Sequence, residues 1–445
     1  MNTPISEQKR FFIHTLGCKV NQYETQAMRE ILIKSGFKEC QSKEIADIYI
    51  INTCTVTHKA DKESRYWMAI FHKTNPKARI VVTGCYAEAD GPDISFLPGV
   101  AHIVKNSDKG RIADILSGFD NAYHAQRTTH NDLFITGFKD HEKAFVKIQD
   151  GCENRCSYCK VPLVRGPARS RPLKEVVSEV ECLVANGYKE IVLVGICLGA
   201  WGSDLEHGAI AREVGIRGPS LTDVLKTIGR IKGDFRIRLS SIEPKYVTDE
   251  LIEYISGTNR ICRHLHVPLQ SGDDDILARM KRQYTAGQYR ALIDKVRKRI
   301  AGVSITTDVL VGFPGESDLN FRNTVGFIKA VLPSRTHIFT FSRRKGTEAY
   351  GMGDGLKDDV LKKRYYELNT AALGASYLYR HEFINRKLDV LVEAKRDRKT
   401  GMLSGYSDNY IRIHFDGPDE LIKRIVPVKV EDASLLYTLG RYGNE

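Results

Sequence analysis

The chain has 445 residues, too many for one ordinary domain, so we expect two or three domains that each bury a core. Lysine and arginine number 67 against 55 aspartate and glutamate, a formal charge of +12 that suits a polyanionic partner. No apolar run reaches the roughly 18 residues of a membrane span. Ten cysteines without an apolar N-terminal segment indicate a reducing compartment, which argues against a secreted disulfide scaffold. We expect a cytoplasmic monomer that binds no membrane.

The first part of the chain, residues 1–135, alternates predicted strands with predicted helices. A helical pattern around residues 27–36 and a second at 58–73 separate three apolar, β-branched runs. Such alternation predicts a parallel sheet, which binds ligands at the carboxyl ends of its strands. The predicted strands and the cysteine after each are 11–16 with Cys18, 48–51 with Cys54, and 79–83 with Cys85.

These three cysteines can therefore converge in space although about thirty residues separate them, and together they could hold a metal centre. The alternative is three unrelated small core residues. Gly17 and Gly84 each precede a cysteine and give the backbone room to turn, which favours the metal centre.

A polar stretch at residues 119–142 predicts a linker to a second domain, residues 141–375. This domain again alternates strands and helices, in an α/β pattern of six units that predicts an open, partial (βα)6 barrel. Barrel active sites gather at the carboxyl ends of the strands. The predicted strands are 144–148, 190–194, 235–239, 264–267, 304–310 and 336–341.

Three cysteines with the spacing Cys-x3-Cys-x2-Cys follow the first barrel strand directly: Cys152, Cys156 and Cys159. Three thiolates in eight residues can wrap only one centre, and soft ligands favour zinc or an iron–sulfur cluster. A zinc knuckle would need a fourth Cys or His, and the nearest histidine is His141. A four-iron cluster would instead keep one iron open for chemistry, and we favour it.

The last part of the chain, residues 380–445, predicts a small β-barrel after a connecting helix at 357–380. Its predicted strands are 387–393, 402–405, 410–415 and 425–431. Lys395, Arg396 and Arg398 crowd one turn near Tyr410, and basic turns beside aromatic rings suit single-stranded RNA. The alternative is a solvated charge cluster.

Basic residues also follow the cysteine loop. Arg165, Arg169 and Arg171 are spaced by Gly and Pro in a stiff loop, and arginine grips phosphate and stacks on bases. We expect these three side chains to contact RNA. A loop that is merely solvated is the alternative.

The cysteine spacing, with Tyr158 before the third cysteine, resembles the signature of the radical S-adenosylmethionine (SAM) superfamily. The resemblance implies a [4Fe–4S] cluster whose open iron receives the methionine end of SAM. It also implies SAM contacts at the strand ends, where residues 309–316 resemble an adenine-contacting segment, although polar residues there can simply cap helices. The expected SAM contacts are Tyr158, Gly195, Ser240, Glu243, Gln270, Asp308 and Gly312.

The segments 14–25, 52–54 and 83–85 resemble the N-terminal domain of the methylthiotransferases. This resemblance implies that Cys18, Cys54 and Cys85 hold an auxiliary [4Fe–4S] cluster. Residues 16–25 look like the branch that acts on N6-threonylcarbamoyladenosine at tRNA position 37. The resemblance extends to Arg343 and Arg344 as RNA contacts and to the C-terminal barrel as a TRAM RNA-binding module.

In that family one SAM methylates a sulfur of the auxiliary cluster and a second SAM supplies a radical, which suits adenine C2–H because this hydrogen is not acidic. The implied partners are the tRNA anticodon stem-loop, an external one-electron donor and a sulfur source. Two other substrates stay open, isopentenyladenosine and a ribosomal-protein aspartate, and so does a non-catalytic RNA-binding redox sensor. Cys197 and residues 203–218 have no assigned role.

Overall fold

The computed structural model describes residues 8–41, 45–118, 133–139, 141–205, 218–353 and 355–443. Most of the predicted linker and of the segment 203–218 lie outside these residues. The chain divides into two compact units. Unit 1 is Met1–Gly137 with Cys159–Pro167, and unit 2 is Phe138–Tyr158 with Ala168–Glu445. Within the described residues, every helix is too short or too polar to cross a membrane.

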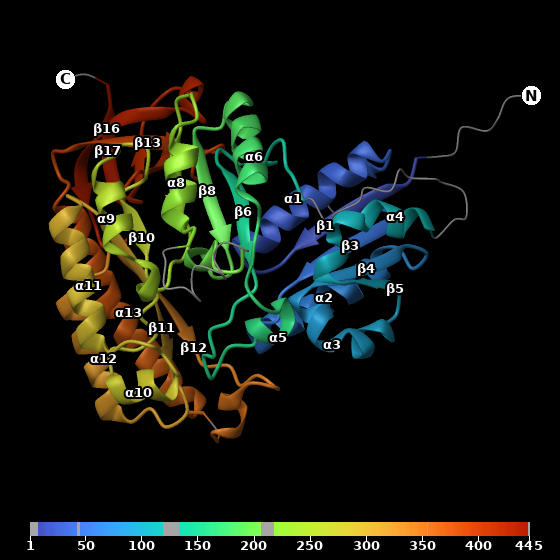
Figure 1. Ribbon diagram of the computed structural model, residues 1–445, viewed down its shortest axis with the longest axis horizontal. Coiled ribbons are helices and arrows are strands. Elements are labelled where there is room, and N and C mark those ends of the chain that lie inside the picture. The colour runs from blue at the N-terminus through green and yellow to red at the C-terminus, as the bar shows by residue number, and fades with distance from the viewer. Residues whose placement is uncertain are drawn as a thin grey trace, which may run out of the picture. The chain divides into compact units, whose positions relative to one another are not determined.

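Unit 1 is built on a five-stranded parallel sheet in the order β2-β1-β3-β4-β5 (Figure 1). The strands are β1 (Arg10–Thr15), β2 (Lys38–Glu39), β3 (Ile48–Thr53), β4 (Arg79–Gly84) and β5 (Val100–Val104). The three predicted strands are confirmed. The sequence missed β2, which has two residues, and β5, whose central residues are exposed at the sheet edge.

Alternating side chains of the central strand fill the core on both faces of this sheet. Ile48 and Ile50 pack on one face with Phe11, while Tyr49 and Ile51 pack on the other with Phe71. The helices of the unit are α1 (Lys19–Lys34), α2 (His58–Thr74), α3 (Cys85–Ser95), α4 (Ile112–Ser117) and α5 (Val161–Arg165). The last helix follows the cysteine loop in sequence and packs beside α3 (Figure 1).

Unit 2 contains all six predicted barrel strands. Together with the short strand β7, they form two sheets, β7-β6-β8-β9 and β10-β11-β12. Isolated bridges such as Ser241↔His266 connect the two sheets. The strands are β6 (Ala144–Asp150), β8 (Glu190–Gly195), β9 (Arg236–Leu239), β10 (His264–His266), β11 (Ser304–Val311) and β12 (Arg335–Thr340). These six run parallel, as a partial barrel requires. The short antiparallel β7 (Arg169–Ser170) was not predicted.

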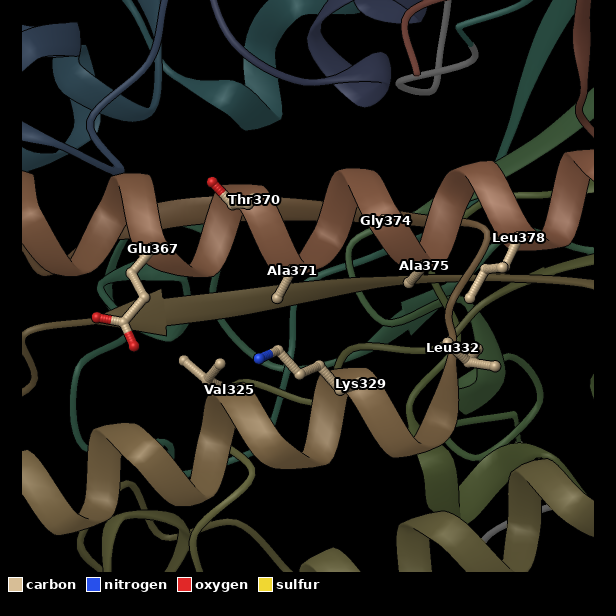
Figure 2. Close-up of a pocket in the computed structure, with 9 residues that line it drawn as sticks. All are labelled: Val325, Lys329, Leu332, Glu367, Thr370, Ala371, Gly374, Ala375 and Leu378. Carbon is tan, nitrogen blue, oxygen red and sulfur yellow. The ribbon is translucent and has the colours of Figure 1, made fainter. Parts of the chain in front are cut away.

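The helices of unit 2 cover the outer side of these strands (Figure 1). They are α6 (Leu173–Ala185), α8 (Leu221–Gly229), α9 (Asp249–Ser256), α10 (Asp274–Arg279), α11 (Ala286–Arg299), α12 (Asp318–Val331) and α13 (Asp358–His381). A groove of about 470 Å³ lies between α12 and α13, and Figure 2 shows the side chains that line it. Ala371, Gly374 and Ala375 leave this space open because their side chains are small, and none of the lining residues is a predicted site residue.

The C-terminal strands of unit 2 close into a five-stranded barrel, in the order β13-β14-β15-β17-β16. The strands are β13 (Lys387–Val392), β14 (Leu403–Ser407), β15 (Arg412–Phe415), β16 (Ile425–Ala433) and β17 (Thr438–Tyr442). The small β-barrel is therefore confirmed. Its core contains Val390, Ile413 and Val428, and the unpredicted β17 closes it by pairing with both β15 and β16.

A buried ionic cluster joins this barrel to the parallel sheet. Arg236 and Arg238 on β9 both pair with Glu190 on β8, at 2.7 and 2.8 Å. Their remaining N–H groups donate to the carbonyl oxygens of Asp389 and Asp408 in the barrel, each at 2.9 Å. Burial opposes the charge on Glu190, but the two guanidinium groups outweigh it and hold the pKa of this carboxyl well below its usual range.

Candidate cluster sites

The three N-terminal cysteines all lie at the carboxyl edge of the unit 1 sheet. Asn52 on β3 pairs in register with Thr15 on β1 and with Thr83 on β4, so the three strands end side by side. Cys18, Cys54 and Cys85 follow these ends within one to three residues. Cys54 lies close enough to Cys85 and Cys18 to interact electrostatically with both, so the three thiols share this edge of the sheet.

Two glycines make this convergence possible. Gly17 has φ +96°, and a Cβ atom there would lie 3.0 Å from the Cys54 Sγ atom. Gly84 has φ +94°, and a Cβ atom there would lie 2.3 Å from the Thr53 carbonyl oxygen. Positive φ and such close approach both favour glycine, so any larger residue would displace a cysteine or a strand end.

A buried network of charges supports the three cysteines. Glu24 on α1 is fully buried and pairs with two cations, Lys109 and Arg165. The Arg165 Nη1 atom lies 2.6 Å from Glu24, and its Nη2 donates to Asn21 at 2.6 Å. Its Nε–H donates to the Cys85 Sγ atom at 3.3 Å. Arg165 therefore places a positively charged donor directly against a thiol, which favours an anionic ligand there.

Hydrogen bonds of asparagine side chains tie this network to the strand ends. The Asn21 amide donates to the carbonyl oxygens of Leu16 and Thr53, at 2.7 and 2.9 Å. Lys109 donates to the Asn52 side chain at 3.1 Å. The loops that carry Cys18 and Cys54 are therefore held by the same side chains that hold Arg165.

Burial, together with smaller contributions from the neighbouring thiols Cys85 and Cys18, raises the pKa of the Cys54 thiol to about 11. Burial also raises the pKa of the Cys18 thiol. Thiols that resist ionisation in this way gain from a bound cation or cluster, which stabilises the thiolate form. No three His, Cys, Asp or Glu side chains of the described residues are arranged around a single metal ion.

The cysteine loop of unit 2 follows β6 and contains Cys152 and Cys156, while Cys159 belongs to the segment that falls in unit 1. Arg282 donates from Nη1 to the Cys156 Sγ atom at 3.2 Å. The same guanidinium pairs with Glu243 after β9 and donates to the Tyr284 hydroxyl at 3.0 Å. Arg282 thus fixes a positive charge beside a predicted cluster ligand.

A fourth cysteine, Cys197, lies beside the Cys152 thiol. A hydrogen bond between them lowers the pKa of Cys152 to about 7 and raises that of Cys197. The Cys197 backbone N–H donates to the Gln149 side chain at 2.7 Å, and Gln149 also donates to the Gly151 carbonyl oxygen at 2.9 Å. Gln149 therefore links the end of β6 to the loop after β8.

The middle of the cysteine loop is anchored to unit 2 by Ser157 and Tyr158. The Ser157 hydroxyl donates to the Arg279 carbonyl oxygen at 2.7 Å, and its own carbonyl accepts from Ala349 at 2.8 Å. The ring of Tyr158 packs against Phe313, with centroids 6.5 Å apart. The loop is thereby held to the carboxyl side of the sheet, where a barrel site is expected.

Most of the predicted SAM contacts follow the carboxyl ends of unit 2 strands, whereas Asp308 lies within β11 and Tyr158 in the cysteine loop. The Ser240 hydroxyl is buried without a hydrogen-bond partner among the described residues, so it can serve a ligand. Asp308 pairs with His266 at 3.2 Å, and its backbone carbonyl accepts from Gln270 at 2.8 Å.

Two glycines of the predicted SAM set shape turns in the backbone. Gly312 has φ +79°, and its N–H donates to the Glu316 carboxylate at 2.9 Å. Gly195 ends β8, where a Cβ atom would lie 3.1 Å from the Gln149 side chain. Both positions bring the backbone close to other groups, which only glycine permits without a shift of the neighbour.

The predicted RNA contacts divide into buried and exposed side chains. Arg165 is 2% exposed and Arg344 is 3% exposed, so neither presents its guanidinium to a phosphate. Arg171 pairs with the buried Glu179, Arg343 donates to the Tyr350 carbonyl oxygen, and Arg396 pairs with Asp419. Among the residues that the structure describes, Arg169, Lys395 and Arg398 are exposed and have no such pairing.

Tyr410 was predicted to stack on bases, but its ring already contacts protein groups. It stacks on His264 at 4.4 Å and on Tyr406 at 4.8 Å between centroids, and the Arg238 guanidinium lies 4.8 Å from its centroid. A ring packed in this way is not free to receive a base. The packed Tyr410 ring instead joins the barrel to the parallel sheet, because it contacts Tyr406 of the barrel and His264 of β10.

Sequence reasoning gave no role to several residues of these sites. Asn21 and Glu24 lie inside a segment that was singled out, yet only their contacts reveal their function. Lys109 and Arg282 carry no local signal. The hydrogen bond from Arg282 to Cys156 spans 126 residues, so no motif could have indicated it.

Two family models match the chain. Residues 10–105 match the "Uncharacterized protein family UPF0004", and residues 146–328 match the radical SAM superfamily. These ranges contain Cys18, Cys54 and Cys85 in the first case, and Cys152, Cys156 and Cys159 in the second.

Curated relatives match almost the whole chain. The threonylcarbamoyladenosine tRNA methylthiotransferase MtaB of Bacillus subtilis (strain 168) is 37% identical over 96% of this chain and 95% of its own. The tRNA-2-methylthio-N(6)-dimethylallyladenosine synthase of Desulfitobacterium hafniense (strain Y51) is 31% identical over 94% of each chain. Among solved structures, the radical SAM methyltransferase TsrM of Kitasatospora setae has a TM-score of 0.55 at 15% identity, over 77% of this chain and 74% of its own, which supports the fold.

Proposed function

Because the chain belongs to the radical SAM methylthiotransferase family, we propose that it converts N6-threonylcarbamoyladenosine at tRNA position 37 to its 2-methylthio derivative. The near full-length similarity to the Bacillus subtilis enzyme carries this proposal. The lower identity to the dimethylallyladenosine synthases favours the threonylcarbamoyl substrate over the isopentenyl one. Sulfur transfer needs a second site besides the one that cleaves SAM. The three cysteines that follow the unit 1 strands would supply it.

When bound, SAM and two [4Fe–4S] clusters supply the radical that removes the C2 hydrogen and the sulfur that replaces it. Cys152, Cys156 and Cys159 would hold the cluster that binds SAM. The trio of Cys18, Cys54 and Cys85 would hold the second. The Ser240 hydroxyl is buried without a partner among the described residues, which supports a polar ligand at the end of β9. The other predicted SAM contacts would line the same carboxyl side of the strands.

Protein groups around the cysteines would set the charge at each site. Arg282 places its guanidinium against Cys156, and Arg165 places its Nε–H against Cys85. Each arginine is oriented by a carboxylate, Glu243 in the first case and Glu24 in the second. A fixed N–H donor on a cysteine sulfur stabilises the thiolate and raises the reduction potential of a cluster that it holds.

The substrate and the other partners follow from this chemistry. The anticodon loop is already single-stranded, so extruding its adenosine costs little. The exposed cations Arg169, Lys395 and Arg398 are suited to RNA phosphates. The reaction also requires an external one-electron donor and a sulfur source, in a reducing compartment such as the cytoplasm.

Mass spectrometry of tRNA nucleosides tests the proposal. Anaerobically reconstituted protein is incubated with SAM, dithionite and tRNA that carries both N6-threonylcarbamoyladenosine and N6-isopentenyladenosine. We expect the mass of a methylthio group to appear on the threonylcarbamoyl nucleoside, because the chain is 37% and 36% identical to two enzymes named for that substrate. Methylthiolation of only the isopentenyl nucleoside would contradict the proposed substrate. Formation of no 5′-deoxyadenosine would contradict the enzyme class.

A further inference from the structure

A cavity of about 460 Å³ lies in unit 2 between the amino ends of β11 and β12, helix α13 and the C-terminal barrel. This volume is in the range of small-molecule sites, roughly 300–1,000 Å³. Its polar lining includes Arg335 and Thr336 on β12, Asn369 on α13, and His414 on β15. None of these residues belongs to the sites described above.

Several polar groups of this cavity have no protein partner. The Thr336 hydroxyl and the His414 Nδ1 atom are buried without a hydrogen bond among the described residues, and His414 is only 8% exposed. Arg335 is exposed and forms no ion pair in the described part of the chain. Buried polar groups are nearly always satisfied, so such a set points to a ligand that supplies the missing partners.

The charge of the cavity favours an anion. Its lining includes Arg335, Arg380 and Arg412 and no aspartate or glutamate. Arg412 pairs with Glu393 at 2.8 Å, but Arg380 donates only to neutral oxygens, among them the carbonyls of Leu435 and Tyr437. Two guanidinium groups therefore remain without a carboxylate at the cavity.

The rim of the cavity is apolar and aromatic. Tyr437 is 48% exposed and Leu436 is 80% exposed, both in the loop before β17. Exposed rings and large aliphatic side chains of this kind stack against the flat faces of nucleobases, while arginine takes the phosphate. The combination suits a nucleotide better than a simple anion.

We infer that this cavity binds one nucleotide of single-stranded RNA, with the phosphate at Arg335 and the base against Tyr437. The inference rests on the proposed function, since the RNA in question is the tRNA substrate. Arg335 is the first residue of β12, at the amino edge of the parallel sheet, whereas the cysteine loop follows the carboxyl end of β6. The nucleotide bound here is therefore an anchor and not the adenosine that reacts.

Equilibrium binding of a fluorescent tRNA transcript to the full chain, over a series of salt concentrations and without SAM, tests the inference. We expect Arg335→Ala to weaken binding about tenfold, as for a charged hydrogen bond. The slope of log K against log salt should fall by about 0.7, the value for one phosphate contact on a single strand. Arg290→Ala on α11 removes the same charge from an exposed surface outside the cavity and should leave both quantities unchanged.

A second variant tests the base contact separately. Tyr437→Ala should weaken binding without changing the salt slope, and 4-thiouridine in the transcript should crosslink to the peptide that contains Tyr437 in the wild type. Equal affinity of the Arg335→Ala and Arg290→Ala variants, or crosslinks only elsewhere, would overturn the inference. Either result is distinct from failure of the proposed function, because the wild type would still form the 2-methylthio nucleoside in the separate assay.

Discussion

The triple variant Cys18→Ala, Cys54→Ala, Cys85→Ala is expected to cleave SAM to 5′-deoxyadenosine and to form no 2-methylthio nucleoside. The contacts that hold Cys152 and Cys156 come from Arg282, Gln149 and Ser157 of unit 2, and none involves the three substituted cysteines. Radical formation should therefore survive, whereas the sulfur to be transferred loses its ligands. Liquid chromatography and mass spectrometry of both products from one reaction measure the two activities together.

The chain offers a matched control for this experiment. Cys40, Cys182 and Cys262 are three further cysteines outside both trios, and their replacement by alanine removes the same number of thiols. This control variant should retain both products. Loss of 5′-deoxyadenosine in the first variant but not in the control would show that the two trios do not act as separate sites.

Glu24→Ala is expected to lower the free energy of unfolding of unit 1 by about 3–5 kcal/mol, the usual cost of removing one partner from a buried ion pair. Glu24 is fully buried, and its carboxylate is the counter-ion of both Lys109 and Arg165. The variant leaves two cations buried together without a carboxylate between them. The loss should exceed that of any exposed ion pair in the same unit.

Urea unfolding followed by tryptophan fluorescence measures this effect for unit 1 alone. The chain has two tryptophans, Trp67 in unit 1 and Trp201 in unit 2, so a Trp201→Phe background leaves one reporter. Asp47→Asn is the control, because the Arg10–Asp47 pair is nearly half exposed and should contribute about 1 kcal/mol or less. An equal loss for Glu24→Ala and Asp47→Asn would contradict the structural role of the buried network.

The parts of the fold that the sequence predicts are those with a strong local pattern. Residues 48–51 are a continuous β-branched and aromatic run, and β3 is buried along its whole length. The six barrel strands show the same kind of pattern. Among the strands that were missed, β5 and β17 are partly exposed, so their apolar periodicity is too weak to indicate a strand.

The functional residues also divide into those that a sequence pattern indicates and those whose role depends on distant contacts. Cysteine spacing and strand ends predict both trios, because each depends on positions close in sequence or on a repeated topology. The burial of Arg165 could not be predicted, since its counter-ion Glu24 is 141 residues away. From sequence alone Arg165 and Arg169 look equivalent, yet one is buried beside Cys85 and the other is exposed. The packing of Tyr410 could not be predicted either, because its ring contacts His264 and Tyr406 only in the folded protein.

The central claim is that two separate trios of thiolates hold two iron–sulfur clusters, and iron and acid-labile sulfide per chain test it most directly. The wild type, the variant of Cys18, Cys54 and Cys85, and the control variant of Cys40, Cys182 and Cys262 are reconstituted anaerobically side by side. We expect the first variant to retain about half of the wild-type iron and sulfide, since each trio holds one four-iron cluster, and the control to retain all of it. Equal iron and sulfide in the wild type and the first variant would contradict the claim.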